Sequence, residues 1–137
     1  MANRIFVVIL SSFLMAQHNI KGIIGEEQAL GFLRAKGYEI LEVNWRFLHL
    51  ETDIIAMDKV AGKLVFIEVK TRSDTQYGAP ELAVTLKKQK NLIRAANFYI
   101  DQINYNGESR FDIITVLDQP DGSFEINHID DAFYPTL

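Results

Sequence analysis

The chain has 137 residues, the length of one domain with a sizeable core. It contains no cysteine, which excludes disulfides and thiolate metal sites, and its three histidines are too far apart in sequence to suggest a zinc site. The net charge of −4 argues against broad, non-specific coating of nucleic acid, but it is compatible with a local basic strip beside an acidic site.

The first residues combine one basic side chain with an apolar stretch that is short for a membrane span. Three interpretations are open: a signal peptide, a short hydrophobic anchor, or a leader translated upstream of the real start. We favour the leader, because Met15 is itself a suitable N-terminus and the amphipathic pattern starts only after Asn19. We therefore expect residues 1–14 to be a non-native leader or a disordered extension. Residues 15–137 are expected to form a single cytoplasmic domain that does not enter a membrane.

Hydrophobic periodicity and turn residues predict the order helix, three strands, helix, two strands. The expected ranges are 20–37 for the first helix, 38–47 for the first strand, about 51–57 and 63–71 for a hairpin, 72–81 for a loop, 82 or 85 to 101 for the second helix, and 110–117 and 124–129 for the last strands. This order indicates an α/β sandwich around a mixed sheet.

The predicted hairpin carries the most informative spacing in the chain. Fourteen residues (54–67) separate Asp53 from Glu68, and a turn divides the two apolar runs between them. An antiparallel hairpin places Asp53 opposite Glu68, and Lys70 shares their face because side chains alternate with period two. Two facing carboxylates repel each other, and a divalent cation such as Mg²⁺, which takes oxygen ligands, would allow them to coexist.

Several short motifs occur along the chain in a fixed order. From Met15 on they are Gly25-Glu26 with Ala29, Gly37-Tyr38, Asn44-Trp45-Arg46, Glu51-x-Asp53-Ile54-Ile55-Ala56, Phe66-Ile67-Glu68-Val69-Lys70-Thr71-Arg72, Lys88-Gln89 and Arg110-Phe111-Asp112. This ordered set resembles the YraN-like family of bacterial proteins, within the PD-(D/E)xK nuclease superfamily of restriction enzymes and Holliday junction resolvases. The resemblance implies a restriction-endonuclease-like α/β sandwich, a mixed β-sheet flanked by helices. The chain departs from the family in one place: Leu50-Glu51-Thr52 stands where the family usually has glycine, glutamate and isoleucine.

The resemblance also implies roles for the site residues. Asp53 and Glu68 would hold Mg²⁺ or Mn²⁺, with the Val69 carbonyl as a third ligand. Lys70 would orient or help deprotonate a bound water, or stabilise the developing charge. Glu26 would complete the metal shell directly or through water. By its sequence alone, Glu26 could equally be an acid in the first turn of its helix, where the helix dipole favours it.

A second group of residues is predicted to contact nucleic acid. These are Thr71 and Arg72, which leave the active strand, and Lys87, Lys88, Gln89 and Arg94 near the start of the second helix. A basic helical face is usually only solvated, but in a nuclease it would contact phosphates. Trp45 is expected to pack in the protein rather than to stack on a base.

The sequence leaves two hypotheses for function. The first is a metal-dependent endonuclease that hydrolyses phosphodiester bonds in DNA. Branched or otherwise structured DNA is the expected substrate, because a chain this small has no room for a separate specificity domain. Resolvase-like members of the superfamily often act as dimers, so a homodimer fits this hypothesis. The second is a catalytically silent nuclease fold that binds nucleic acid or a protein partner. The presence of all four site residues disfavours it, whereas the acidic net charge and the altered approach to Asp53 keep it open.

Overall fold

The computed structural model describes residues 2–73 and 84–135, with side chains from Asn19 onward. Its elements in chain order are α1 (Ala2–Ala35), β1 (Glu39–Phe47), β2 (Leu50–Asp58), β3 (Lys63–Arg72), α2 (Leu86–Ile103), β4 (Ser109–Asp118) and β5 (Phe124–Phe133). The predicted order of helices and strands is confirmed. Most of the predicted loop 72–81 falls in residues 74–83, outside the described residues.

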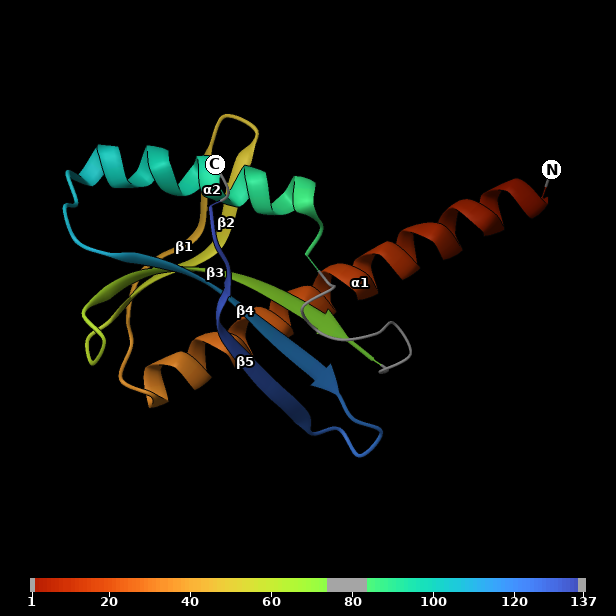
Figure 1. Cartoon of the computed structure of the whole chain (residues 1–137). Coiled ribbons are helices and arrows are strands. Elements are labelled where there is room, and N and C mark those ends of the chain that lie inside the picture. The colour runs from red at the N-terminus through yellow and green to blue at the C-terminus, as the bar shows by residue number, and fades with distance from the viewer. Residues whose placement is uncertain (1, 74–83, 136–137) are drawn as a thin grey trace.

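The strands form one mixed sheet in the order β1-β2-β3-β4-β5. Neighbouring strands pair antiparallel, except β3 and β4, which are parallel. A parallel pair requires a crossover connection, and α2 lies in that connection. α1 packs against one face of the sheet and α2 against the other (Figure 1). This arrangement confirms the predicted α/β sandwich with a mixed sheet.

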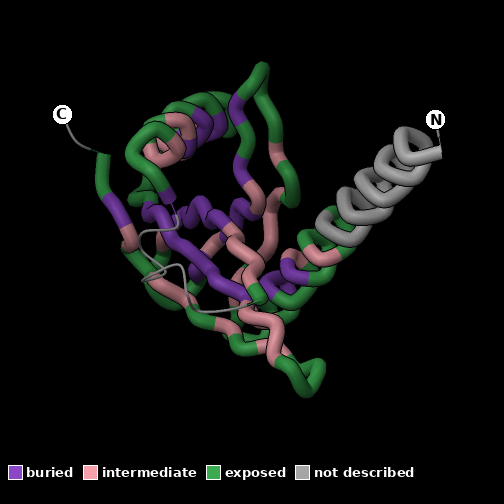
Figure 2. The backbone as a smooth tube through the Cα atoms, turned by 90° about the vertical axis from the view of Figure 1, so that its right-hand side faces the viewer, coloured by how far each residue is buried: buried purple, intermediate pink, exposed green. Residues whose placement is uncertain are grey.

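The core consists of two apolar clusters, one on each face of the sheet. Phe66 on β3 packs with Leu92 of α2, whereas its neighbour Ile67 packs with Leu33 of α1. Phe66 is 2 % exposed and Ile67 is fully buried. Figure 2 shows buried residues along the central strands and on the helix surfaces that face them. Successive side chains of β3 thus enter the two clusters in alternation, as expected for a central strand.

α1 begins at Ala2 and is therefore longer than the predicted helix 20–37. No glycine or proline occurs before Gly22, so the chain contains no residue that would stop the helix there. Its other end agrees with the prediction, because Gly37 adopts a φ of 88°, the left-handed conformation that ends helices. The assignment of residues 1–14 to a leader stays a prediction.

α2 begins at Leu86, directly after residue 85, the later of the two predicted start positions. Thr85 is its N-cap, and the Thr85 hydroxyl accepts a hydrogen bond from the Lys88 backbone N–H at 3.2 Å. β5 extends past the predicted end at residue 129 to Phe133, whose ring stacks on Phe111 at 5.0 Å between centroids. Over the residues that the structure describes, neither helix has an apolar stretch long enough to span a bilayer.

Candidate active site

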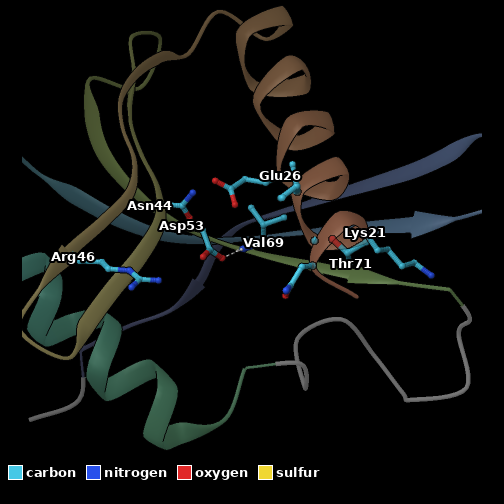
Figure 3. A pocket seen from close by; sticks show the side chains of 10 residues that line it. Lys21, Glu26, Asn44, Arg46, Asp53, Val69 and Thr71 are labelled. Atoms are coloured by element: carbon cyan, nitrogen blue, oxygen red, sulfur yellow. Dashed lines mark hydrogen bonds between the residues drawn. The ribbon is translucent and has the colours of Figure 1, made fainter. Parts of the chain in front are cut away.

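The β2–β3 hairpin places the two predicted acids opposite each other. Its ladder pairs Ile55 with Phe66 and Ile54 with Ile67, and one further step along each strand reaches Asp53 and Glu68. The predicted register is therefore confirmed. The Val69 backbone N–H donates a hydrogen bond to Asp53 Oδ2 at 2.8 Å (Figure 3), which fixes the carboxylate against β3.

Asp53 and Glu68 form a pair of acids of which one is buried. Glu68 is 4 % exposed, whereas Asp53 is partly exposed between β1 and β3. Burial, followed by the charge of Glu68, raises the pKa of Asp53 to about 7, although the hydrogen bond from Val69 acts in the opposite direction. At neutral pH the folded protein thus holds a proton on Asp53 for part of the time. A hard divalent cation would relieve the repulsion, so the two carboxylates and the adjacent Val69 carbonyl are a donor set that fits Mg²⁺ or Mn²⁺.

Two lysines converge on the same oxygen of Glu68. Lys70 Nζ lies 3.6 Å and Lys88 Nζ lies 2.6 Å from Glu68 Oε1. Burial and then the nearby Lys88 lower the pKa of Lys70. Burial is the largest single influence on Lys88 and acts to lower its pKa, but the hydrogen bond to Glu68 and the charges of Glu68 and Asp53 together outweigh it, so the pKa is raised. Lys88 was predicted only as a phosphate contact, and the structure brings it into the acidic cluster from α2.

Glu26 approaches Asp53 from α1, across a cleft of about 780 Å³. Figure 3 shows the Glu26 side chain directed toward Asn44, and Asp53 beside them with its carboxylate turned toward Val69. Burial raises the pKa of Glu26, with a hydrogen bond to Asn44 acting against the shift. Because α1 begins at Ala2, Glu26 lies in the middle of the helix, and the alternative that it is a first-turn acid is wrong.

Asn44 is a site residue to which sequence reasoning gave no role. The pairs Val43–Ile54 and Trp45–Thr52 place it opposite Asp53, and its φ is 52°. This left-handed conformation is uncommon within a strand and is one that asparagine tolerates. The only signal in the sequence was its place in the motif Asn44-Trp45-Arg46. Trp45 itself packs against Tyr99 at 5.4 Å between ring centroids, which confirms its predicted packing role.

Comparison of the amino-acid sequence with known protein families gives independent information about the chain. The model of the uncharacterised protein family UPF0102 matches residues 25–116. The chain belongs to this family. A UPF0102 protein of Bacteroides thetaiotaomicron is 46 % identical over 123 residues, which cover 90 % of this chain and 99 % of the relative. A UPF0102 protein of Christiangramia forsetii is 44 % identical over 120 residues, covering 88 % of this chain and 98 % of the relative. The match confirms the resemblance to the YraN-like family, and the PD-(D/E)xK nuclease superfamily is consistent with it.

The Gly25-Glu26 motif of this UPF0102 chain has a steric explanation. A Cβ atom at Gly25 would overlap the Thr71 hydroxyl, so glycine allows α1 to approach β3 closely. That close approach brings Glu26, the next residue, to the cleft. Thr71 also lines the cleft, and the partly exposed Arg72 follows it at the end of β3.

The other residues predicted to contact nucleic acid lie along α2. Gln89 Nε2 donates a hydrogen bond to the Val84 carbonyl at 3.1 Å, so its amide anchors the start of the helix. Lys87 lines a second cleft, of about 220 Å³, beside Lys88 and the β1–β2 loop. Arg94 is exposed, nearly two turns beyond Lys88. The structure therefore brings Lys88 to the acids, places Lys87 next to it, and leaves Arg94 farther along the helix.

Thr52 marks the place where this chain departs from the usual family pattern. It is 1 % exposed, and its hydroxyl has no hydrogen-bond partner among the described residues. A buried hydroxyl without a partner is destabilising, whereas the isoleucine usual in the family would bury only apolar atoms. Thr52 directly precedes Asp53 on β2, and both acids are present despite the departure.

The Arg110-Phe111-Asp112 motif lies outside the candidate site. Arg110 donates hydrogen bonds to Asp112 at 2.8 Å, to Asp58 at 3.0 Å and to the Tyr38 hydroxyl at 2.8 Å, and His128 Nε2 lies 2.7 Å from Asp112 Oδ2. This network joins β4 to β5 and to the turn between β2 and β3, at the opposite end of the hairpin from Asp53. These residues of the motif therefore stabilise the fold.

No three or more His, Cys, Asp or Glu side chains gather closely enough to hold a metal ion in the part of the chain whose side chains the structure describes. The carboxylates that converge are Asp53 and Glu68, with Glu26 across the cleft. A metal held here would accordingly take two carboxylates and a backbone carbonyl from the protein, and its remaining ligands from water or substrate.

Proposed function

We propose that the protein is a metal-dependent endonuclease that hydrolyses phosphodiester bonds in branched or otherwise structured DNA. The observation that carries the proposal is the position of Asp53 opposite the buried Glu68, with Lys70 3.6 Å from the Glu68 carboxylate. Such a pair destabilises the metal-free protein, and this is the expected cost of a site arranged for a cation. The lysine places a positive group where a phosphate and an attacking water would meet.

Each residue of the cluster then has a distinct part in the reaction. Mg²⁺ or Mn²⁺ would be held by Asp53, Glu68 and the Val69 carbonyl, and would polarise a phosphate and acidify a bound water. Lys70 orients that water and stabilises charge on the phosphate, and its lowered pKa makes the neutral amine, the form that can accept a proton, easier to reach than in an exposed lysine. Glu26, which forms a hydrogen bond with Asn44, would complete the metal shell directly or through a water.

The basic residues around the cluster would bind the DNA backbone. Lys21 and Arg46 line the cleft that contains Glu26 and Asp53, and Lys87 and Arg94 are exposed on α2. Phosphate contacts of this kind position the substrate without reading its sequence. In its bacterial relatives DNA lies in the cytoplasm, where we expect this protein to act. A homodimer would present two such sites to the arms of a branched substrate.

One observation favours a second candidate, a nuclease fold that binds DNA without cutting it. Lys88 Nζ lies 2.6 Å from Glu68 Oε1, so a cation of the protein already neutralises the carboxylate that would hold a metal. In a protein that has lost catalysis, this ion pair would serve as a permanent substitute for the metal. The two candidates differ in whether a divalent cation displaces Lys88 from Glu68.

The test is a cleavage assay in Mn²⁺ on linear, flapped and four-way DNA, with an Asp53→Asn variant purified in parallel. The nuclease proposal expects the wild type to cut at least one branched DNA and Asp53→Asn to cut none. Equal cutting by both proteins would reveal a contaminating nuclease. If the wild type cuts no DNA and Mn²⁺ does not raise its melting temperature, the binding-only candidate replaces the proposal.

A further inference from the structure

The loop between β1 and β2 exposes a large apolar side chain at its tip. Phe47 pairs with Leu50, which leaves a loop of Leu48 and His49. Leu48 is 80 % exposed and has a φ of 56°, a conformation that favours glycine or asparagine. Leucine is thus unfavourable at this position for two reasons: its side chain disfavours the left-handed backbone conformation, and its apolar atoms are exposed to water. A position that is costly in both respects is a candidate for a functional one.

Aromatic rings pack together next to the loop that carries Leu48. The Phe47 ring lies 4.5 Å from that of Phe98 on α2, and it stacks on Trp45 with an interplanar angle of 11°. Phe47 and Phe98 are 39 % and 41 % exposed. We call Phe47, Leu48 and Phe98 the apolar tip. Figure 1 shows the β1–β2 loop projecting beside α2, and the ring contacts hold it there.

Cations flank the apolar tip along α2. Arg94 lines a cavity of about 260 Å³ together with Phe98. Lys87 and Lys88 line the cavity of about 220 Å³ together with the loop residue His49. Phe47 pairs with Leu50, which precedes Asp53 by three residues on β2, so the base of the tip lies about 10 Å from Asp53 along the strand and Leu48 lies farther out. The apolar tip is therefore next to the candidate active site, with basic residues on either side.

We propose that the apolar tip stacks on an unpaired base at a DNA branch point, while Lys87 and Arg94 hold the neighbouring phosphates. This inference rests on the proposed function and specifies its substrate: DNA in which an unstacked base lies beside a duplex. Exposed aromatic rings beside cations bind single-stranded DNA in this way, and apolar side chains wedge between unstacked bases. A second copy of the chain is a poorer occupant, because a two-fold contact through the tip would bring the cations of both copies together.

The test measures binding separately from cleavage, by fluorescence anisotropy in EDTA. The ligands are a forked DNA with unpaired bases at the branch and a linear duplex of the same length. Leu48→Asn removes the apolar side chain and keeps a residue suited to the left-handed conformation, so the fold is retained. We expect it to weaken fork binding roughly tenfold and to leave duplex binding unchanged. Val60→Asn is the matched control, because Val60 is 95 % exposed at the β2–β3 turn, and it should bind both DNAs as the wild type does.

Three results would overturn the inference: an unchanged ratio of fork to duplex affinity in Leu48→Asn, no binding of the fork by the wild type, or light scattering that shows a wild-type dimer and a Leu48→Asn monomer. The outcomes also separate this inference from the proposed function. A wild type that binds the fork through Leu48 but cuts no DNA would refute the nuclease and leave the tip standing. Metal-dependent cutting with no effect of Leu48 on fork binding would do the reverse.

Discussion

Lys88 Nζ on α2 lies 2.6 Å from Glu68 Oε1 on β3, closer than the 3.6 Å of Lys70 on the same strand as Glu68. The contact is a charge-assisted hydrogen bond to a carboxylate that is 4 % exposed. A metal ion bound to Glu68 would have to share this oxygen with Lys88 or displace it. Through Lys88, the second helix would therefore lower the affinity of the proposed site for a cation.

Replacing this lysine tests that competition. Lys88→Met keeps the aliphatic stem and removes the charge, so we expect divalent cations to bind roughly tenfold more tightly, as judged from the strength of hydrogen bonds to charged groups. Isothermal titration with Mn²⁺ measures the change. Lys90→Met, an exposed position on the same helix, is the control and should leave the affinity unchanged. An equal effect of both variants would show a general electrostatic effect rather than competition at Glu68.

The raised pKa of Asp53 makes stability depend on pH. In the folded, metal-free protein this pKa is about 7, against about 4 in an unfolded chain. Between these values the folded state holds the proton more tightly, so the contribution of Asp53 to stability is complete below pH 4 and is lost as the pH rises through 7. Asp53→Asn should remove this loss, and the melting temperature of the variant should exceed that of the wild type at pH 8 in EDTA. If the melting temperatures of the two proteins changed by the same amount from pH 5 to pH 8, the raised pKa of Asp53 would be contradicted.

Thr52 offers a stabilising substitution. Thr52→Val keeps the shape of the side chain and replaces the buried hydroxyl, which has no partner among the described residues, with a methyl group. We expect the free energy of unfolding to rise by about 1 kcal/mol, as when a buried unsatisfied group is removed. Urea unfolding at constant pH measures the change. A loss of stability would mean that the hydroxyl is hydrogen-bonded in solution.

Phe66 tests the central position of β3. Phe66→Ala should lower the free energy of unfolding by about 3–5 kcal/mol, because the ring is buried against α2 and leaves a cavity. Val60→Ala, at the exposed β2–β3 turn, should be nearly neutral in the same urea titration. A small effect at Phe66 would place β3 at an edge and would undermine the geometry of Asp53 and Glu68.

The sequence predicted those parts of the structure that depend on local periodicity. The register of Asp53 and Glu68 follows from the alternation of the hairpin and the position of its turn, and the structure has that register. The contact of Lys88 with Glu68 could not be predicted, because it depends on where the crossover returns α2 to the sheet. Glu26 was ambiguous since the start of α1 was placed too late.

Two further features lay beyond pattern reasoning. Asn44 faces Asp53 through a left-handed backbone conformation, which interrupts the alternation that predicts the direction of strand side chains. β5 continues through Asp130 and Asp131 to Phe133, because Phe133 packs against Phe111 although the acids conceal the strand pattern. Tertiary contacts determined both outcomes, and neither contact has a fixed spacing in the sequence.

The most direct measurement is single-turnover cleavage of four-way DNA in Mn²⁺, combined with Mn²⁺ titration of the same proteins. Asp53→Asn and Glu68→Gln keep the side-chain shapes but should lose both Mn²⁺ binding and cleavage. Lys70→Ala should retain Mn²⁺ binding and lose cleavage, because its proposed role is on the water and the phosphate. Cleavage by the wild type alone, with Mn²⁺ bound by the wild type and Lys70→Ala, is the predicted result. Full cleavage by Lys70→Ala, or Mn²⁺ binding that survives in Asp53→Asn and Glu68→Gln, would contradict the proposed site.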